Sequence, residues 1–287
     1  MNGYPLIKII ECPRDAMQGW KKFIPTERKI EYINSLLRVG FDTIDFGSFV
    51  SPKMIPQMAD TTEVIPNLDL GNSNSKLLAI TANYRGAEAA CIFDEISYLG
   101  FPFSVSETFQ QRNTNSSIAE SVDRVEDIQN LCIKSGKQLA VYISMGFGNP
   151  YNDPYDEEIV FEWVSRMVAM DIGIISLADT VGLATPEQVY DITSYLVESL
   201  PGTEIGVHMH SSPKNWEEKL EAAVNAGCKR FDGALKGIGG CPMSGNELVG
   251  NMNSELMINY FEKKQLLNNL NKQALAESIR IAGEIFI

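Results

Sequence analysis

Strand-like and helix-like segments alternate along the whole chain. This alternation is typical of a parallel sheet covered by helices, because each parallel connection needs a crossover that a helix usually provides. The strand-like runs are 6–10, 42–46, 77–81, 95–99, 139–145, 173–177, 204–208 and 230–234. Eight units favour a closed barrel, and 287 residues exceed the roughly 250 that such a barrel needs. We therefore predict an α/β fold, a (β/α)8 TIM barrel, in which residues 1–287 form a single domain with helices at its C-terminal end.

Capping residues and stop signals place several helix ends. Thr26 is expected to be the N-cap of a helix that Gly40 ends. Thr185 is expected to cap the helix 186–200 in the same way. Between the first strand and the first helix, we interpret 13–15 as a polar turn.

The charge balance excludes two classes of partner. The formal net charge is −13, from 24 Lys and Arg against 37 Asp and Glu. This balance repels phosphate backbones and anionic lipid head groups, so we expect neither nucleic acid nor a membrane surface as a partner. No stretch of the sequence approaches the roughly 20 apolar residues that a membrane span needs.

Cysteine usage indicates the compartment. The five cysteines are an odd number, form no C-x-x-C pair, and suit neither a disulfide framework nor a zinc site. A reducing compartment fits this usage, and the N-terminal apolar run is too short for a signal peptide. We therefore expect a cytoplasmic protein. The cysteines are Cys12, Cys91, Cys132, Cys228 and Cys241.

The strongest single signal for chemistry is the segment VHMH. Its two histidines, His208 and His210, are the only ones in the chain, and they stand two residues apart at a strand end. Side chains alternate along a strand, so residues i and i+2 point to the same face. Two imidazoles on one face predict a pair of metal ligands. The alternative is two ordinary histidines held by hydrogen bonds at a strand end.

Other polar residues should meet these histidines, because active sites of such barrels lie at the C-terminal ends of the strands. Asp15 and an asparagine would complete a mixed oxygen and nitrogen ligand set, which suits Mg2+ or Mn2+, with Zn2+ as an alternative. The adjacent Arg14 would stabilise a developing negative charge. An Arg-Asp pair is also what a plain salt bridge at the rim looks like.

Further strand ends carry candidate residues. Asp45 ends the second strand, and Asp179 with Thr180 follows the sixth. Cys241 lies in a glycine-rich loop after the eighth strand, where a thiol could act as an acid or a base. Each has a structural alternative: Asp45 as a strand-end cap, Asp179 as a partner of backbone amides, and Cys241 as an inert cysteine.

Five segments resemble the 3-hydroxy-3-methylglutaryl-CoA lyase family, in the family's order. They are ECPRDAMQ (11–18), SFVSPKMIPQM (48–58), SLADTVGLATP (176–186), VHMH (207–210) and GIGGCPMSGNELVGNM (237–252). The resemblance extends from about Ile9 to Tyr260. VHMH is shared with a wider group of metal-dependent barrels, whereas the SFVSPK, PQM and GGCP segments are typical of the lyases.

The resemblance implies a metal site and its ligands. The family pattern for the asparagine is a Gly-Asn pair with a glutamate four residues later, which Asn251 and Glu255 fit and Asn246 does not. The implied ligands are Asp15, His208, His210 and Asn251. The implied catalytic residues are Arg14, Asp15, His208 and Cys241, and the implied substrate-binding residues are Gln18, Asp45, Asp179, Thr180 and Glu255.

The chain also departs from the family pattern. RDAMQGW (14–20) stands where the family usually has RDGLQNE, and Asp45 replaces a glutamate. Ser211 follows the second histidine, where Asp or Asn is common. SMGFGNPY (144–151) lacks the cysteine expected near the fifth strand end. These departures leave the reaction class intact and the preferred acyl group open.

What the resemblance implies is metal-dependent retro-Claisen cleavage of (S)-3-hydroxy-3-methylglutaryl-CoA to acetoacetate and acetyl-CoA, as in leucine degradation. Either Asp15 or His208 would serve as the base. An acyl-CoA thioester is anionic, so a local basic patch is needed, and Lys21, Lys22 and Lys53 are the candidates. The relatives often pair, so we expect a homodimer. The alternatives are a related acyl-CoA condensation, a 2-oxo-acid aldolase, or a catalytically silent binding barrel.

Overall fold

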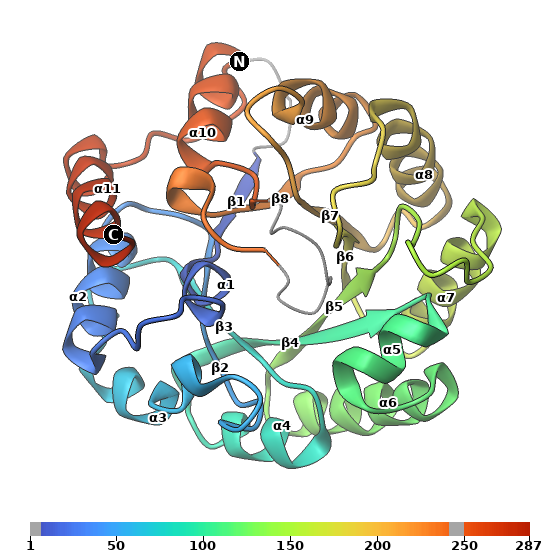
Figure 1. Cartoon of the computed structure of the whole chain (residues 1–287), viewed down its shortest axis with the longest axis horizontal. Helices are drawn as coiled ribbons and strands as arrows, with labels where there is room; N and C mark the ends of the chain where they lie inside the picture. Colours follow the sequence, from blue (N-terminus) through green and yellow to red (C-terminus); the bar gives the residue numbers. More distant parts are fainter. Residues whose placement is uncertain (1–6, 241–249) are drawn as a thin grey trace.

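The computed structural model describes residues 7–240 and 250–287. In this part of the chain, eight parallel strands close into a barrel in the order β1 to β8, and helices surround it (Figure 1). The strands are β1 Lys8–Glu11, β2 Thr43–Ser48, β3 Lys76–Ile80, β4 Ile96–Ser104, β5 Gln138–Ser144, β6 Ile174–Asp179, β7 Glu204–Met209 and β8 Arg230–Gly233. The predicted (β/α)8 TIM barrel is therefore confirmed.

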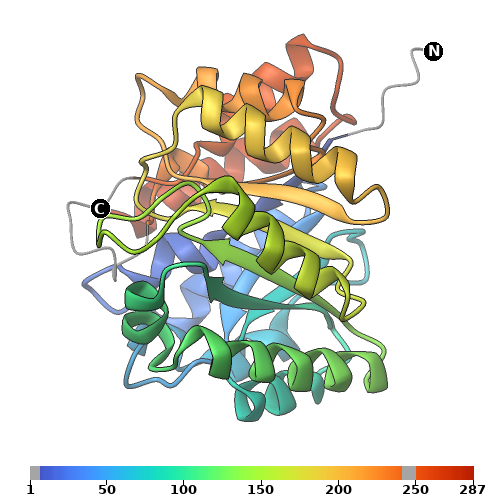
Figure 2. The same cartoon turned by 90° about the vertical axis from the view of Figure 1, so that its right-hand side faces the viewer.

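The helices lie against the outside of the strands, as the side view shows for the green to yellow helices (Figure 2). They are α1 Pro13–Gln18, α2 Thr26–Leu37, α3 Thr61–Val64, α4 Tyr84–Cys91, α5 Glu107–Thr114, α6 Ile118–Lys134, α7 Glu157–Val168, α8 Pro186–Ser199, α9 Trp216–Asn225, α10 Ser254–Lys263 and α11 Lys272–Ile285. Three short 3-10 helices are η1 Pro56–Met58, η2 Ile65–Asn67 and η3 Leu235–Gly237. Within the described ranges, none of the helices is both long and apolar enough to cross a membrane.

The core has two parts because strand side chains alternate between the two faces of the barrel. On β3, Leu77 and Ala79 pack outward under the helices, whereas Leu78 and Ile80 belong to a smaller cluster inside the barrel. Gly206 on β7 leaves room inside the barrel for Arg230, since a Cβ at this glycine would lie 3.1 Å from three side-chain carbons of the arginine.

Several predicted boundaries differ from those in the structure. The expected turn at 13–15 is instead the start of α1, where Pro13 occupies the first helical position and lacks only an N–H that has no partner there. Thr26 is the first residue of α2 and Pro25 is its N-cap, because the Thr26 hydroxyl donates to Asp60 Oδ2 at 2.8 Å instead of capping the helix. Thr185 is confirmed as the N-cap of α8, where it forms a capping box with Gln188.

Glu11 is a buried carboxyl group that joins β1 to both ends of the segment 235–254. It accepts a hydrogen bond from the Leu235 backbone N–H at 2.8 Å and another from the Ser254 hydroxyl. Its side chain is fully buried, and burial raises its pKa to about 8, although both hydrogen bonds oppose that shift. The folded protein therefore holds a proton on Glu11 in a pH range where the unfolded chain has lost it.

We expect Glu11→Gln to remove a pH dependence of stability. Between the ordinary pKa of 4.5 and the raised value of about 8, the native state binds one more proton than the unfolded state, so stability falls as pH rises. The loss is on the order of 4 kcal/mol over this range. Urea unfolding at pH 5 and pH 8 should show Glu11→Gln gaining relative to the unsubstituted protein, whereas exposed Glu95→Gln should not. A pH-independent difference would contradict the prediction.

Candidate active site

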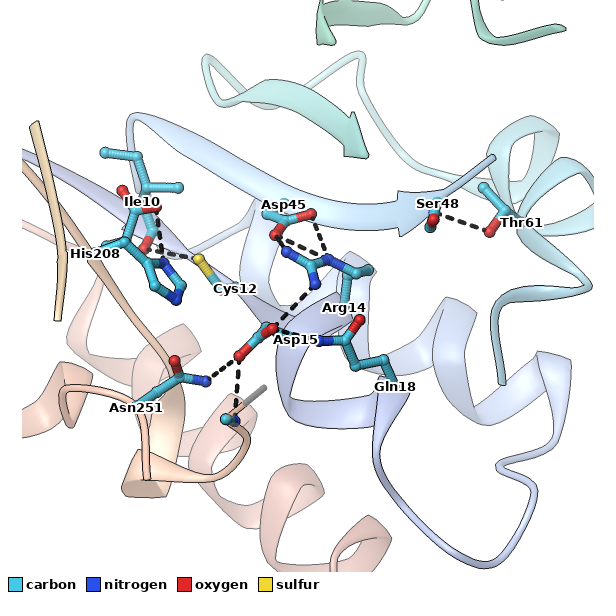
Figure 3. A network of polar contacts seen from close by, with 12 residues as sticks. Ile10, Cys12, Arg14, Asp15, Gln18, Asp45, Ser48, Thr61, His208 and Asn251 are labelled. Atoms are coloured by element: carbon cyan, nitrogen blue, oxygen red, sulfur yellow. Dashed lines mark hydrogen bonds and ion pairs between the residues drawn. The ribbon is translucent and has the colours of Figure 1, made fainter. Parts of the chain in front are cut away.

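The site is built at the C-terminal ends of β1, β7 and β8, with α1 reaching in from the loop after β1 (Figure 3). Because α1 is helical, Asp15 and Gln18 lie one turn apart on one face, and the Gln18 amide donates to Asp15 Oδ1 at 2.6 Å. Arg14 Nη1 donates to the same oxygen at 3.0 Å. The short helix that replaced the predicted turn thus sets the direction of all three side chains.

Three side chains that were predicted as metal ligands come together. One ligand atom from each of Asp15, His208 and His210 lies within 4.8 Å of the others. Asp15 and His210 are buried, and His208 is slightly exposed. The convergence expected from the strand-end positions is therefore present.

Hydrogen bonds at Nδ1 orient both histidine rings. His208 Nδ1 lies 3.1 Å from Asp232 Oδ2, and His210 Nδ1 lies 2.9 Å from the carbonyl oxygen of Thr180. Because both partners are acceptors, each Nδ1 carries the proton and each Nε2 offers a lone pair. His210 Nε2 is buried and has no hydrogen-bond partner among the described residues. A buried, unpartnered lone pair of this kind is what a metal ligand presents.

Asn251 adds a fourth donor atom. Its amide N–H groups bond to Asp15 Oδ2 at 2.7 Å and to the Ile238 carbonyl oxygen at 2.9 Å. These bonds fix the amide so that Oδ1 is buried without a partner in the described part of the chain. The alternative ligand, Asn246, lies outside the described residues. One carboxylate oxygen, two imidazole nitrogens and one amide oxygen form a set that fits a divalent cation with positions left for substrate oxygens.

A second cluster, made of Cys12, His208 and Asp232, is less suited to a metal. The Cys12 thiol is fully buried, and burial raises its pKa well above the ordinary value, so the thiolate that a metal requires is disfavoured. Asp232 also carries the hydrogen bond to His208 that orients the ring.

Arg14 and Asp45 form a buried pair beside the cluster. Arg14 Nε donates to Asp45 Oδ1 at 3.2 Å and Nη2 donates to Asp45 Oδ2 at 2.5 Å, an arrangement in which both carboxylate oxygens are held. Burial raises the pKa of Asp45 to about 6, although Arg14 opposes that shift. For Asp15, burial also favours the neutral form, but Arg14 and the two histidines outweigh it and lower the pKa to about 2. The two carboxyl groups thus differ in proton affinity because of their surroundings.

An open cavity adjoins the cluster. Of the predicted residues, those that line it are Arg14, Asp15, Gln18, Thr180, His208 and His210. Its apolar wall comes from Val50, Met54, Ile55, Ile80, Pro102 and Phe109. The cavity therefore offers charged groups at its floor and hydrocarbon along its sides.

Other predicted residues lie elsewhere. Asp45 and Asn251 are outside the cavity lining and contact it through Arg14 and Asp15. Asp179 is bound by the Lys219 ammonium and the Ala184 N–H, and Glu255 accepts from the backbone N–H of Lys236. Cys241 lies outside the described residues.

Sequence reasoning missed Asp232 and Tyr142. Asp232 bonds His208, and the Tyr142 ring meets the His208 ring edge-on, with centroids 5.9 Å apart. Asp232 pairs directly with His208 across β7 and β8. The strand-end rule that selected His208 would also have selected Asp232 if it had been applied inside the eighth strand.

Comparisons with known proteins agree with this geometry. The HMGL-like family model matches residues 7–281. The mitochondrial hydroxymethylglutaryl-CoA lyase of Bos taurus is 32% identical over 95% of this chain and 83% of its own length. Hydroxymethylglutaryl-CoA lyase YngG of Bacillus subtilis (strain 168) is 30% identical over 93% of this chain and 89% of its own. The structure of an HMG-CoA lyase from Acenitobacter baumannii, solved with coenzyme A and 3-methylmalate, has a TM-score of 0.91 at 30% identity and covers 98% of this chain and 91% of that one.

Proposed function

This chain belongs to the HMGL-like family, and from this premise we propose that it is a carbon–carbon lyase that cleaves (S)-3-hydroxy-3-methylglutaryl-CoA to acetoacetate and acetyl-CoA. One observation carries the proposal: Asp15, His208 and His210 converge beside Arg14 at the floor of an open cavity. Relatives at about 30% identity that carry the name of this lyase, over most of the chain, support it.

The proposed cofactor is a divalent cation, Mg2+ or Mn2+, held by Asp15, His208, His210 and Asn251. Two buried atoms without partners, His210 Nε2 and Asn251 Oδ1, support this set. When bound, such a cation supplies Lewis acidity, lowering the pKa of the substrate hydroxyl and fixing its orientation.

Two groups are candidates for the base that takes the hydroxyl proton. Asp15 holds protons weakly, because its pKa is about 2. For His208, burial lowers the pKa but the hydrogen bond and charge of Asp232 outweigh it, so its pKa is raised. This contrast favours His208 as the proton acceptor at Nε2. The same atom faces the proposed cation position, so His208 can act as ligand or as base, but not both at one moment.

Arg14 is proposed to stabilise the acetyl-CoA enolate that forms when the carbon–carbon bond breaks. A guanidinium has five N–H donors, and the bonds to Asp15 and Asp45 leave one N–H on each of Nη1 and Nη2. These remaining donors can meet a developing negative charge, and their direction is fixed before the reaction begins. Cys241 is proposed to return the proton to carbon, as the family resemblance implies.

The thioester substrate needs cations at the mouth of the site. Lys21, Lys22 and Lys53 are exposed, and two of their near neighbours in sequence, Gln18 and Met54, line the cavity. We propose these lysines as the contacts for the coenzyme A phosphates. Further proposals are that residues 1–287 form one domain, that Glu255 and Thr180 contact the substrate, and that the protein is a cytoplasmic homodimer. The curated relatives carry both mitochondrial and cytoplasmic names.

One assay tests the proposed activity. The purified protein should form acetoacetate and acetyl-CoA in equal amounts from 3-hydroxy-3-methylglutaryl-CoA with Mg2+ or Mn2+. EDTA should abolish this activity, and excess metal should restore it. Cleavage of a 2-oxo acid with no cleavage of the thioester would favour the aldolase alternative. Binding of the thioester without product under any metal would favour the silent barrel.

A further inference from the structure

Lys219 is an ammonium group buried at the rim of the barrel. Its side chain extends from α9, and only 1% of the residue is exposed. Nζ donates to Asp179 Oδ2 at 2.7 Å and to the carbonyl oxygens of His210 at 3.1 Å and Gly182 at 3.4 Å. An ammonium has three N–H donors, so these three acceptors satisfy it completely. One side chain therefore ties together the ends of β6 and β7.

The two strand ends that Lys219 joins carry parts of the metal site. His210 is a proposed ligand, and its ring is oriented by the carbonyl oxygen of Thr180, the residue after Asp179. The turn that follows β6 is held by two further bonds, from the Ala184 N–H to Asp179 Oδ1 and from the Met145 N–H to the Thr180 hydroxyl. Lys219 thus fixes both the backbone of His210 and the turn whose carbonyl aims its ring.

We propose that Lys219, acting through Asp179, is a positioning residue for the metal site. It holds the His210 backbone and the Thr180 carbonyl at a fixed separation, so that the His210 Nε2 lone pair points at the ion. Because Asp179 bonds Lys219 and does not line the cavity, its role is to hold the turn rather than to contact the substrate. This inference rests on the proposed function and deepens it.

The energetic reason is geometric. A buried ion pair generally adds little net stability compared with hydrocarbon of the same shape, because both charges lose their hydration. Partners that orient a metal-ligating histidine, in contrast, typically change metal affinity by about 10- to 100-fold when they are removed. The effect of Lys219 should therefore appear in metal affinity more than in folding.

The test uses a double variant, because removing Lys219 alone would leave Asp179 buried and unpaired. In Lys219→Met/Asp179→Asn, the free energy of unfolding should stay near that of the unsubstituted protein. The Kd for Mn2+, measured by calorimetric titration of the metal-stripped protein without substrate, should rise by about 10- to 100-fold. The matched control is Lys29→Met/Asp60→Asn, which removes a second buried pair, with Nζ 2.6 Å from Oδ1, between α2 and the residue before α3. Its Kd for Mn2+ should change by less than about threefold.

Each outcome decides the matter. A Kd for the Lys219 variant within about threefold of the unsubstituted protein would overturn the positioning role while leaving the proposed lyase activity intact. Equal rises in both double variants would also overturn it, since the effect would then follow from loss of any buried pair. If the unsubstituted protein itself binds no Mn2+, the proposed metal-dependent function fails as well.

Discussion

Arg14→Met should lower turnover by about 100- to 1,000-fold while the metal affinity of the protein stays unchanged. Arg14 lines the cavity beside the proposed ligands, and its remaining N–H donors are the only fixed cationic donors among the described residues that line the cavity. Methionine keeps the volume of the side-chain stem but offers no donor to an enolate. Turnover should therefore fall more than KM rises, because the interaction is stronger in the transition state than in the ground state.

The Arg14 variant needs a companion, because Asp45 would lose its buried partner. In Arg14→Met/Asp45→Asn the unpaired carboxyl group is also removed, so a fold-related loss can be separated from a catalytic one. Arg28→Met, which changes an exposed arginine paired with Glu31 and Glu284, controls for the loss of a positive charge. Near-normal turnover in both Arg14 variants would remove this residue from the mechanism.

The second large effect is expected for His210→Ala, which should abolish detectable Mn2+ binding and, with it, turnover. His210 supplies a buried Nε2 that has no other partner in the described part of the chain, and the loss of a ligand should exceed the 10- to 100-fold typical of the groups that merely orient ligands. Asn251→Ala should act in the same direction, because its Oδ1 is the other unpartnered buried atom of the cluster.

Asn246→Ala is the matched control for the asparagine, because it removes the same side chain at the position that the family pattern disfavours. Titration of the metal-stripped proteins with Mn2+, followed by electron paramagnetic resonance of the free ion, gives the Kd values directly. If Asn246→Ala weakens binding and Asn251→Ala does not, the fourth ligand is assigned to the wrong asparagine. Unchanged affinity in His210→Ala would exclude the proposed site.

The architecture could be predicted from sequence because it depends on local, periodic information. Eight alternating units indicated the barrel, and the two-residue spacing in VHMH placed both imidazoles on one strand face. The errors were local as well. Pro13 began a helix where a turn was expected, since proline suits the first helical position as well as a turn.

By itself, the sequence determined the barrel, the rim at which chemistry would occur, and the identity of three converging side chains. Only the tertiary structure decided what holds them in place: the Asp232 carboxylate on His208, the Thr180 carbonyl on His210, and the Lys219 ammonium behind Asp179. Hydrogen bonds need donor and acceptor within about 3 Å, whereas these partners are up to 40 residues apart in the chain. Their distances are set by how strands pair and helices pack, which no local pattern of residues specifies.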